Sequence, residues 1–276
     1  TRVKPRPISS LPIQLSSYLH WAMFSFAVTV NLILLATVSY ALPNNRHRII
    51  SGNEIDIAKV PFLASLSNGS GHYCGGSIIS ERWILTAAHC IGDPTSTDLA
   101  VRVGSSRHAN GGQLVRVRRI VQHHLWNPST IDYDFALLEL AEVLELGKEL
   151  QAVELPVKDE DVANGKLLLV SGWGKTESGS SSNSATLRAV EVPVVNQKKC
   201  EKMYSDFVQV TPRMLCAGHA EGGKDMCNED SGGPLVDENK QVGVVSWSKE
   251  CAAVGNPGVY ARVAAVRDWI EKVAGV

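Results

Sequence analysis

The chain has 276 residues, of which 44% are hydrophobic, with 27 Lys and Arg against 28 Asp and Glu. This length and apolar content suffice for one large domain or two smaller ones, and they exclude a disordered, collagen-like or coiled-coil chain. A net charge of −1 also argues against a nucleic-acid partner, which requires a basic surface. The charge is uneven, because residues 1–48 hold five basic and no acidic residues, which leaves 22 basic and 28 acidic groups for the other 228.

Residues 1–41 have the pattern of a secretory signal. Three basic residues within the first six precede the mostly apolar run Phe24–Val38, and Ser39-Tyr40-Ala41 then offers small residues for cleavage. We therefore expect a signal region over 1–41 and a secreted, extracellular protein. A retained membrane anchor is the alternative, although a span needs about 20 apolar residues. Since the sequence begins with Thr, the expected start of translation is upstream or at Met23.

Beyond residue 48 the pattern predicts an all-β fold. Short runs rich in Val, Ile, Leu and aromatic residues recur between Gly, Pro, Asn and Ser, which favours a sandwich or barrels. The expected strands are Phe62–Leu66, Ser77–Ile79, Trp83–Thr86, Val115–Val121, Phe135–Leu140, Leu167–Ser171, Ala189–Val194, Gln241–Ser246 and Val259–Val263.

Two helices are expected among these strands. Val263, Val266, Trp269, Ile270 and Val273 recur at spacings of three and four, which predicts a closing helix with one apolar face. A shorter helix is expected over Gln197–Tyr204, and the composition of Gly174–Ala185 predicts a flexible surface loop.

Three short motifs indicate nucleophilic catalysis. Ser231 lies in Asp-Ser-Gly-Gly-Pro, His89 in Thr-Ala-Ala-His-Cys, and Asp134 heads an apolar strand. A serine is a poor nucleophile unless a base removes its proton and donors stabilise the oxyanion. The order His, Asp, Ser is one known arrangement of base, orienting acid and nucleophile.

These motifs resemble the trypsin/chymotrypsin family of serine proteases over Ile49 to about Val273. The landmarks that carry the resemblance are Arg48–Gly52, Cys74–Ser77, Thr86–Cys90, Asp134–Leu138, Gly172-Trp173-Gly174, Cys227–Pro234, Ser246-Trp247, Pro257–Tyr260 and Trp269-Ile270. The resemblance implies a protease domain over residues 49–276, built as two six-stranded antiparallel β-barrels with a C-terminal helix.

The resemblance also assigns catalytic roles. Ser231 would attack the scissile carbonyl, His89 would take and return its proton, and Asp134 would orient the imidazole. The backbone N–H groups of Glu229 and Ser231 would form the oxyanion hole. Relatives usually carry Gly at the position of Glu229, so we expect slower acylation here.

The six cysteines are expected to form three disulfides in a secreted protein, although spacing alone allows 15 pairings. The resemblance implies the pairs Cys74–Cys90, Cys200–Cys216 and Cys227–Cys251.

The resemblance further implies a zymogen. An activating protease would cut between Arg48 and Ile49 and release the activation peptide 42–48. The new Ile49 ammonium would pair with Asp230, which His72 would hold before cleavage.

Substrate choice rests on the residues that resemble the family's primary pocket. Asp225, with Gly258 opposite, implies cleavage after Arg or Lys, because a buried carboxylate rejects apolar side chains. Met226 and Ser248 replace smaller residues of the family and are expected to weaken substrate binding. The other expected substrate contacts are Ser246 and Trp247.

No cofactor or metal is expected. His123 and His124 lack the spacing of a metal site and are interpreted as ordinary loop histidines. Asn68-Gly69-Ser70 is a glycosylation sequon, a common triplet, and proline excludes Asn127-Pro128-Ser129.

We therefore expect a monomeric secreted serine endopeptidase whose partners are protein or peptide substrates, an activating protease and protein inhibitors. No nucleic acid is expected, and no membrane unless the leader is retained. Two alternatives stay open: a catalytically impaired homologue that acts as a binding or regulatory protein, and a membrane-tethered protease.

Overall fold

The computed structural model describes residues 52–93, 95, 98–174, 183–223, 230–251 and 253–276. Most of its regular structure is short antiparallel strands. The strands are β1 (Asn53–Glu54), β2 (Leu63–Asn68), β3 (Gly71–Ser80), β4 (Trp83–Thr86), β5 (Ala100–Val103), β6 (Gln113–Gln122), β7 (Ala136–Leu140), β8 (Leu167–Gly172), β9 (Arg188–Val195), β10 (Met214–Ala217), β11 (Pro234–Asp237), β12 (Lys240–Trp247) and β13 (Gly258–Arg262). The helices are η1 (Ile57–Lys59), η2 (Ala88–Cys90), α2 (Gln197–Met203), η3 (Val263–Val266) and α3 (Arg267–Ala274).

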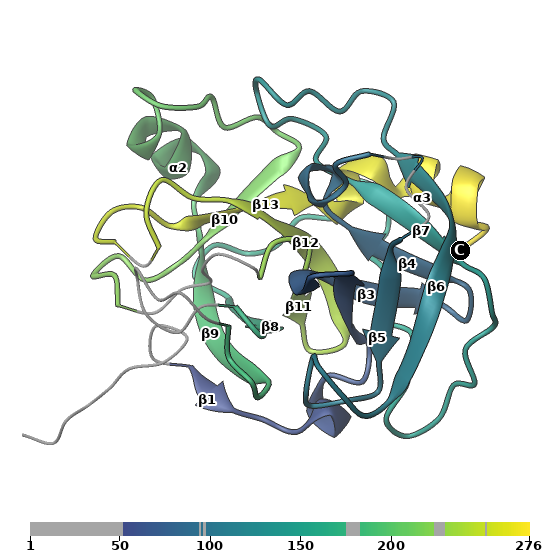
Figure 1. Cartoon of the computed structure of the whole chain (residues 1–276). Helices are drawn as coiled ribbons and strands as arrows, with labels where there is room; N and C mark the ends of the chain where they lie inside the picture. The colour runs from purple at the N-terminus through teal and green to yellow at the C-terminus, as the bar shows by residue number, and fades with distance from the viewer. Residues whose placement is uncertain (1–51, 94, 96–97, 175–182, 224–229, 252) are drawn as a thin grey trace, which may run out of the picture. The chain divides into compact units, whose positions relative to one another are not determined.

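Strands β2 to β7 close into a barrel in the order β2-β3-β4-β7-β6-β5 (Figure 1). Its neighbouring strands β4 and β7 are buried along their whole length, which explains their nearly unbroken apolar sequence. The one charged residue among them, Glu139, is buried and accepts hydrogen bonds from Arg118 and Arg119.

Strands β8 to β13 form a second ring. Their order is β9-β10-β13-β12-β11-β8, and β8 also pairs with β9, so the sheet closes on itself. Alternate residues of β9 face the interior: Val190, Val192 and Val194 are buried while Glu191 is exposed. The predicted pair of six-stranded antiparallel barrels is confirmed, with β1 as an added strand on the edge of β9.

A buried hydrogen bond joins the two barrels. The hydroxyl of Ser77 in β3 donates to Oε1 of Gln241 in β12 over 2.5 Å, and both side chains are inaccessible to solvent. Burying a polar group costs free energy unless it is hydrogen-bonded, so this contact satisfies both side chains where the two barrels meet.

The predicted closing helix is present, but its α-helical part begins only at Arg267, after a 3-10 turn over η3. Val263, Val266 and Ile270 are buried in the core of the first barrel, beside which α3 lies in Figure 1. The helix ends at Gly275, whose φ of 74° is the left-handed cap that glycine adopts without strain. Within the described residues, no helix has the length and apolar character needed to span a membrane.

His123 follows β6 directly and is buried, which its position in a predicted loop did not suggest. Its ring stacks against His124 and Tyr133 at centroid distances of 4.6 and 4.7 Å, and Trp269 meets it edge-on at 4.8 Å. Desolvation by this burial, helped by the nearby His124, lowers the pKa of His123 from 6.5 to about 4. The folded protein therefore keeps this imidazole neutral in mildly acidic solution.

This burial predicts a loss of stability in acid. Below pH 6.5 His123 becomes protonated in the unfolded chain, whereas in the folded chain it becomes protonated only near pH 4. Because the unfolded state binds more protons between these values, the free energy of unfolding falls as the pH is lowered from 6.5 to 4. We expect a loss of roughly 3 kcal/mol by pH 4. Urea unfolding at pH 7 and pH 4.5 should show a clearly smaller loss for His123→Phe than for the parent. The variant His124→Phe removes one of the two causes that lower the pKa of His123 but keeps its burial, so its loss should lie between those of the parent and of His123→Phe. Equal losses in all three proteins would refute the assignment.

Candidate active site

Neighbouring strands of the first barrel bring His89 and Asp134 together. His89 lies in η2, directly after β4, and Asp134 lies two residues before β7. Because β4 and β7 are antiparallel with Thr86 opposite Ala136, the end of one strand and the start of the other meet at the same end of the barrel.

Asp134 holds the imidazole of His89 through two contacts. Its Oδ2 lies 2.7 Å from Nδ1 of His89, and its Oδ1 accepts the backbone N–H of the same residue at 2.8 Å. Asp134 is 1% exposed, whereas 31% of the His89 side chain is exposed. A buried acceptor fixes the proton of a neutral imidazole on Nδ1, which leaves Nε2 as the basic atom on the accessible side.

A third donor to Asp134 comes from the second barrel. The hydroxyl of Ser246, in β12, donates to Oδ2 of Asp134 over 2.5 Å, and Ser246 itself is buried. Ser246 was predicted from the sequence as a substrate contact, whereas in the structure its side chain contacts Asp134. With this contact both barrels support Asp134.

Ser231 lies on a turn that leads into β11. Its carbonyl accepts the N–H of Gly75 in β3 at 2.7 Å, and the N–H of Gly232 donates to Val245 at 2.8 Å, so both barrels hold the turn. Gly232 has φ +81°, and a Cβ there would lie 2.2 Å from Oγ1 of Thr86. Glycine is therefore required beside Ser231 for two independent steric reasons.

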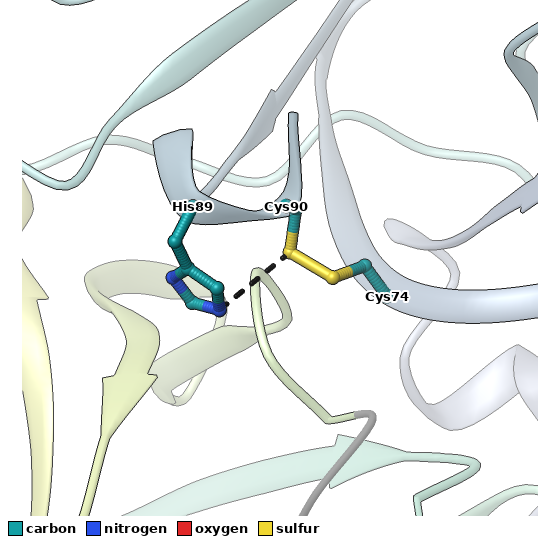
Figure 2. Close-up of side chains that lie close together, drawn as sticks. All are labelled: Cys74, His89 and Cys90. Carbon is teal, nitrogen blue, oxygen red and sulfur yellow. Dashed lines mark hydrogen bonds between the residues drawn. A yellow bond between two sulfur atoms is a disulfide. The ribbon is translucent and has the colours of Figure 1, made fainter. Parts of the chain in front are cut away.

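His89 and Ser231 are not hydrogen-bonded to each other in the described part of the chain. Figure 2 shows Nε2 of His89 directed at the Cys74–Cys90 disulfide, 3.9 Å from Sγ of Cys90. A disulfide sulfur has no proton and can only accept a hydrogen bond. With the proton of the neutral imidazole on Nδ1, the contact at Nε2 is therefore one of packing, and the Nε2 lone pair is not used by a donor there. Catalytic hydrogen bonds are often formed only with substrate in place, and the Ser231–His89 contact stays a prediction.

The same three residues are the described group that most resembles a metal site. The ligand atoms of Cys74, His89 and Cys90 lie within 4.8 Å of one another, but both sulfurs belong to one disulfide with an S–S distance of 2.00 Å. Metal binding by cysteine needs a thiolate, which a disulfide does not offer. This cluster therefore gives no support to a metal centre.

Asp230, the residue before Ser231, is buried in a cradle of glycines. It is 2% exposed, and its Oδ1 accepts the N–H of Gly174 at 2.8 Å. A Cβ on Gly172 would lie 2.2 Å from the carboxylate, and a Cβ on Gly174 would lie 2.5 Å from it. The predicted landmark Gly172-Trp173-Gly174 is thus explained by the space that the Asp230 side chain occupies.

His72, expected to hold Asp230 before activation, contacts a serine that the sequence analysis missed. Its Nδ1 lies 2.8 Å from Oγ of Ser65, and its ring meets Trp173 edge-on at 5.7 Å. Ser65 is fully buried on β2, opposite Gly75 of β3. A lone serine in an apolar run has no sequence signal, because only strand pairing brings it to His72.

The expected substrate contacts lie partly on two paired strands. Trp247 in β12 is opposite Val259 of β13, so Ser246, Trp247 and Ser248 lie close to Gly258. Trp247 packs edge-on against Tyr204 at 4.8 Å, and Phe207, more than half exposed, lies 6.0 Å away. The other expected site residues, Asp225, Met226, Glu229, Arg48 and Ile49, lie outside the described residues.

Two of the three expected disulfides are confirmed. Cys74 is bonded to Cys90 and Cys200 to Cys216, which ties η2 to β3 and α2 to β10. Cys251 is disulfide-bonded as well, and Cys227, its expected partner, lies outside the described residues.

Comparison with known proteins agrees with this geometry. A family model described as Trypsin matches residues 49–270. The chain belongs to the trypsin family of serine proteases. Among relatives of this family, Trypsin 5G1 of Aedes aegypti is 54% identical over 230 residues, 83% of this chain and 86% of that protein. A trypsin of Simulium vittatum is 43% identical over 87% of this chain and 97% of its own length. The vitellin-degrading protease of Bombyx mori is 38% identical over 90% of this chain and 94% of its own length.

Proposed function

We propose that this trypsin-family protein is a secreted serine endopeptidase, made as a zymogen, that cleaves after Arg and Lys. The observation that carries the proposal is the buried Asp134, which orients His89 at the barrel end where the turn of Ser231 is held. In that arrangement His89 is a base whose proton is held on Nδ1 by Asp134, and Ser231 is a nucleophile on a turn held by both barrels.

In the proposed mechanism Oγ of Ser231 attacks the scissile carbonyl while Nε2 of His89 takes its proton. The imidazolium that forms is stabilised by Asp134, and it then returns the proton to the leaving amine. Water, deprotonated by the same imidazole, hydrolyses the acyl-enzyme. The proposed oxyanion donors are the N–H groups of Ser231 and Glu229, and the N–H of Ser231 donates to no acceptor within the described residues.

The proposed substrate preference rests on Asp225, with Met226, Ser248 and Gly258 as further contacts. The trypsin name of two of the relatives above supports it by analogy. Trp247 and Tyr204 are buried, so among these packed aromatic residues only Phe207 offers an exposed ring beside the strand of Ser246, on which residues before the scissile bond could pack.

A labelling experiment tests the proposed activity. After controlled cleavage at Arg48, a fluorophosphonate probe should modify Ser231, and the Ser231→Ala variant should stay unlabelled. A peptide library should then show cleavage after Arg and Lys, and Asp225→Ser should lose that preference. An unlabelled Ser231 in the cleaved protein would favour the impaired homologue, and a profile dominated by Phe, Leu or Ala would contradict the assigned specificity.

Glu229 is proposed to slow acylation. If the oxyanion donor at this position requires positive φ, a Cβ adds roughly 1–2 kcal/mol of strain. The peptide can relieve the strain by turning its N–H away, which loses a donor that contributes about 2.7–4 kcal/mol to the transition state. We expect Glu229→Gly to raise kcat/KM on small Arg substrates at least about tenfold, mainly through kcat.

A second glutamate provides the control for this change. Glu238, in the turn between β11 and β12, has φ 55° and is exposed. Glu238→Gly removes the same side chain from a left-handed position away from the proposed oxyanion hole, so it should leave kcat/KM unchanged. If Glu229→Gly is no faster than the parent after identical activation, the hole is already formed with Glu in place.

A further inference from the structure

The tip of the β2–β3 hairpin presents the one Asn-x-Ser triplet whose middle residue is not proline. Asn68 ends β2, Gly71 begins β3 opposite it, and Gly69 and Ser70 make the two-residue connection. All four residues are exposed. A Cβ added to Gly69 or Gly71 would meet no atom within 4 Å, so the tip projects into open space.

The hydrogen bonding of the tip leaves the acceptor nitrogen available. Oδ1 of Asn68 accepts the backbone N–H of Ser70 at 2.9 Å, which folds the amide back over the residue that carries the hydroxyl. Within the described part of the chain, Nδ2 of Asn68 and Oγ of Ser70 form no hydrogen bond. The amide nitrogen and the hydroxyl that defines the sequon are thus both accessible.

We propose that Asn68 carries an N-linked oligosaccharide. In the transfer, Nδ2 of Asn68 forms a bond to C1 of the first sugar of a lipid-linked oligosaccharide diphosphate. The C1–O bond to the diphosphate breaks, the lipid diphosphate leaves, and Nδ2 loses one proton. The proposal rests on the secretion put forward above, because the transfer takes place in the secretory pathway.

The position of Asn68 gives such a glycan a role in access to the active site. The residue borders two hollows. The first, of about 260 Å³, is also lined by Tyr73 and Cys90, and Sγ of Cys90 lies 3.9 Å from the catalytic imidazole. The second, of about 680 Å³, is lined by His72, Arg102 and Asn183 among others. A glycan at the tip would stand over the edge of the site next to His89, where it would obstruct a protein but not a small peptide.

The experiment uses the full chain, expressed in a secreting eukaryotic cell. An amidase that removes N-glycans should increase its gel mobility, and mass spectrometry should find Asn68 converted to Asp. Asn68→Gln and Ser70→Ala should abolish the shift, whereas Ser70→Thr, which keeps a hydroxyl, should retain it. Asn127 is the matched control, since it is exposed and its Oδ1 accepts the N–H of Ser129 at the same 2.9 Å, but Pro128 blocks the sequon. Asn127→Gln should retain the shift.

The effect on access is measured with activated enzyme before and after glycan removal. On removal of the glycan, kcat/KM for a small Arg amide should change by less than about twofold. The association rate constant with a protein inhibitor should rise at least about threefold. An unmodified Asn68 in secreted chain would overturn the proposal, and equal association rates would overturn the role in access. Either result can occur with Ser231 fully reactive to the fluorophosphonate, so these failures are distinct from a failure of the proposed activity.

Discussion

Asp134→Asn should lower kcat by about 10⁴-fold, the effect that loss of the orienting carboxylate has in a serine protease triad. The geometry gives the reason. Both oxygens of Asp134 accept hydrogen bonds from His89, one from the backbone N–H and one from the imidazole. An asparagine that still accepts the backbone N–H turns its NH₂ toward Nδ1. The imidazole then carries its proton on Nε2, where it cannot accept one from Ser231.

A neighbouring carboxylate separates this effect from a general loss of structure. Asp132 lies in the same loop, but it pairs with Arg213 and accepts the hydroxyl of Thr211 instead of contacting an imidazole. We expect Asp132→Asn to reduce thermal stability while kcat on a small Arg ester stays within about tenfold of the parent. If Asp134→Asn also stays within tenfold, with its melting temperature unchanged, His89 is not the base.

Ser246→Ala should lower kcat, but by much less than Asp134→Asn. Among the described residues the hydroxyl of Ser246 is one of three donors to Asp134, and a hydrogen bond to a charged group contributes about 1.5–3 kcal/mol. The carboxylate keeps both contacts with His89 in this variant, so the tautomer is preserved. If kcat falls much less in Ser246→Ala than in Asp134→Asn, Ser246 helps to position the carboxylate but does not determine the tautomer of His89.

The sequence predicted most of the fold because its strands are strongly patterned. Each of the nine expected strands overlaps an observed one, and the alternation in β9 matches its buried face. Four strands were missed: β1 has two residues, and β5, β10 and β11 have four each. β11 begins with Pro and ends with Asp, which are poor strand residues. Their pairing partners, not their own composition, make them strands.

The site was less predictable because its support is non-local. The motifs identified His89, Asp134 and Ser231, but the contacts of Ser246 with Asp134 and of Gly75 with Ser231 join residues more than 100 positions apart in different barrels. A hydroxyl or a glycine carries no sign of such a partner. Ser65 was missed for the same reason, since only the pairing of β2 with β3 places it beside His72.

The surroundings of Asp230 bear directly on the proposed activation. A carboxylate that is 2% exposed needs a counter-charge or several donors, since burying an unpaired charge is strongly unfavourable. Gly172 and Gly174 leave room for it, and it immediately precedes Ser231, the proposed nucleophile. The arrangement of the Ser231 turn should therefore depend on what pairs with Asp230.

The chain that follows the proposed activation site is anchored by strand pairing and by Arg188. Arg188, mostly buried, donates to the carbonyl of Gly52 and to Glu54, and β1 pairs with β9. From Gly52 back to Ile49 there are three residues, which span at most about 11 Å when extended. That length sets how far a new Ile49 ammonium could move to reach Asp230.

Arg48→Gln should leave the secreted protein about 10²- to 10⁴-fold less active than the cleaved parent, because removal of one partner from a buried ion pair costs about 3–5 kcal/mol. Without cleavage there is no Ile49 ammonium, which is the proposed partner of Asp230. N-terminal sequencing should find Leu42 as the first residue of this variant, and the fluorophosphonate should label it slowly. Arg46→Gln provides the control, since it removes a basic residue of the same peptide but preserves the bond before Ile49, and it should activate normally. Full activity of Arg48→Gln with Leu42 still at the N-terminus would show that Asp230 needs no new ammonium, and that the turn of Ser231 is already held by the contacts of Gly75 and Gly232.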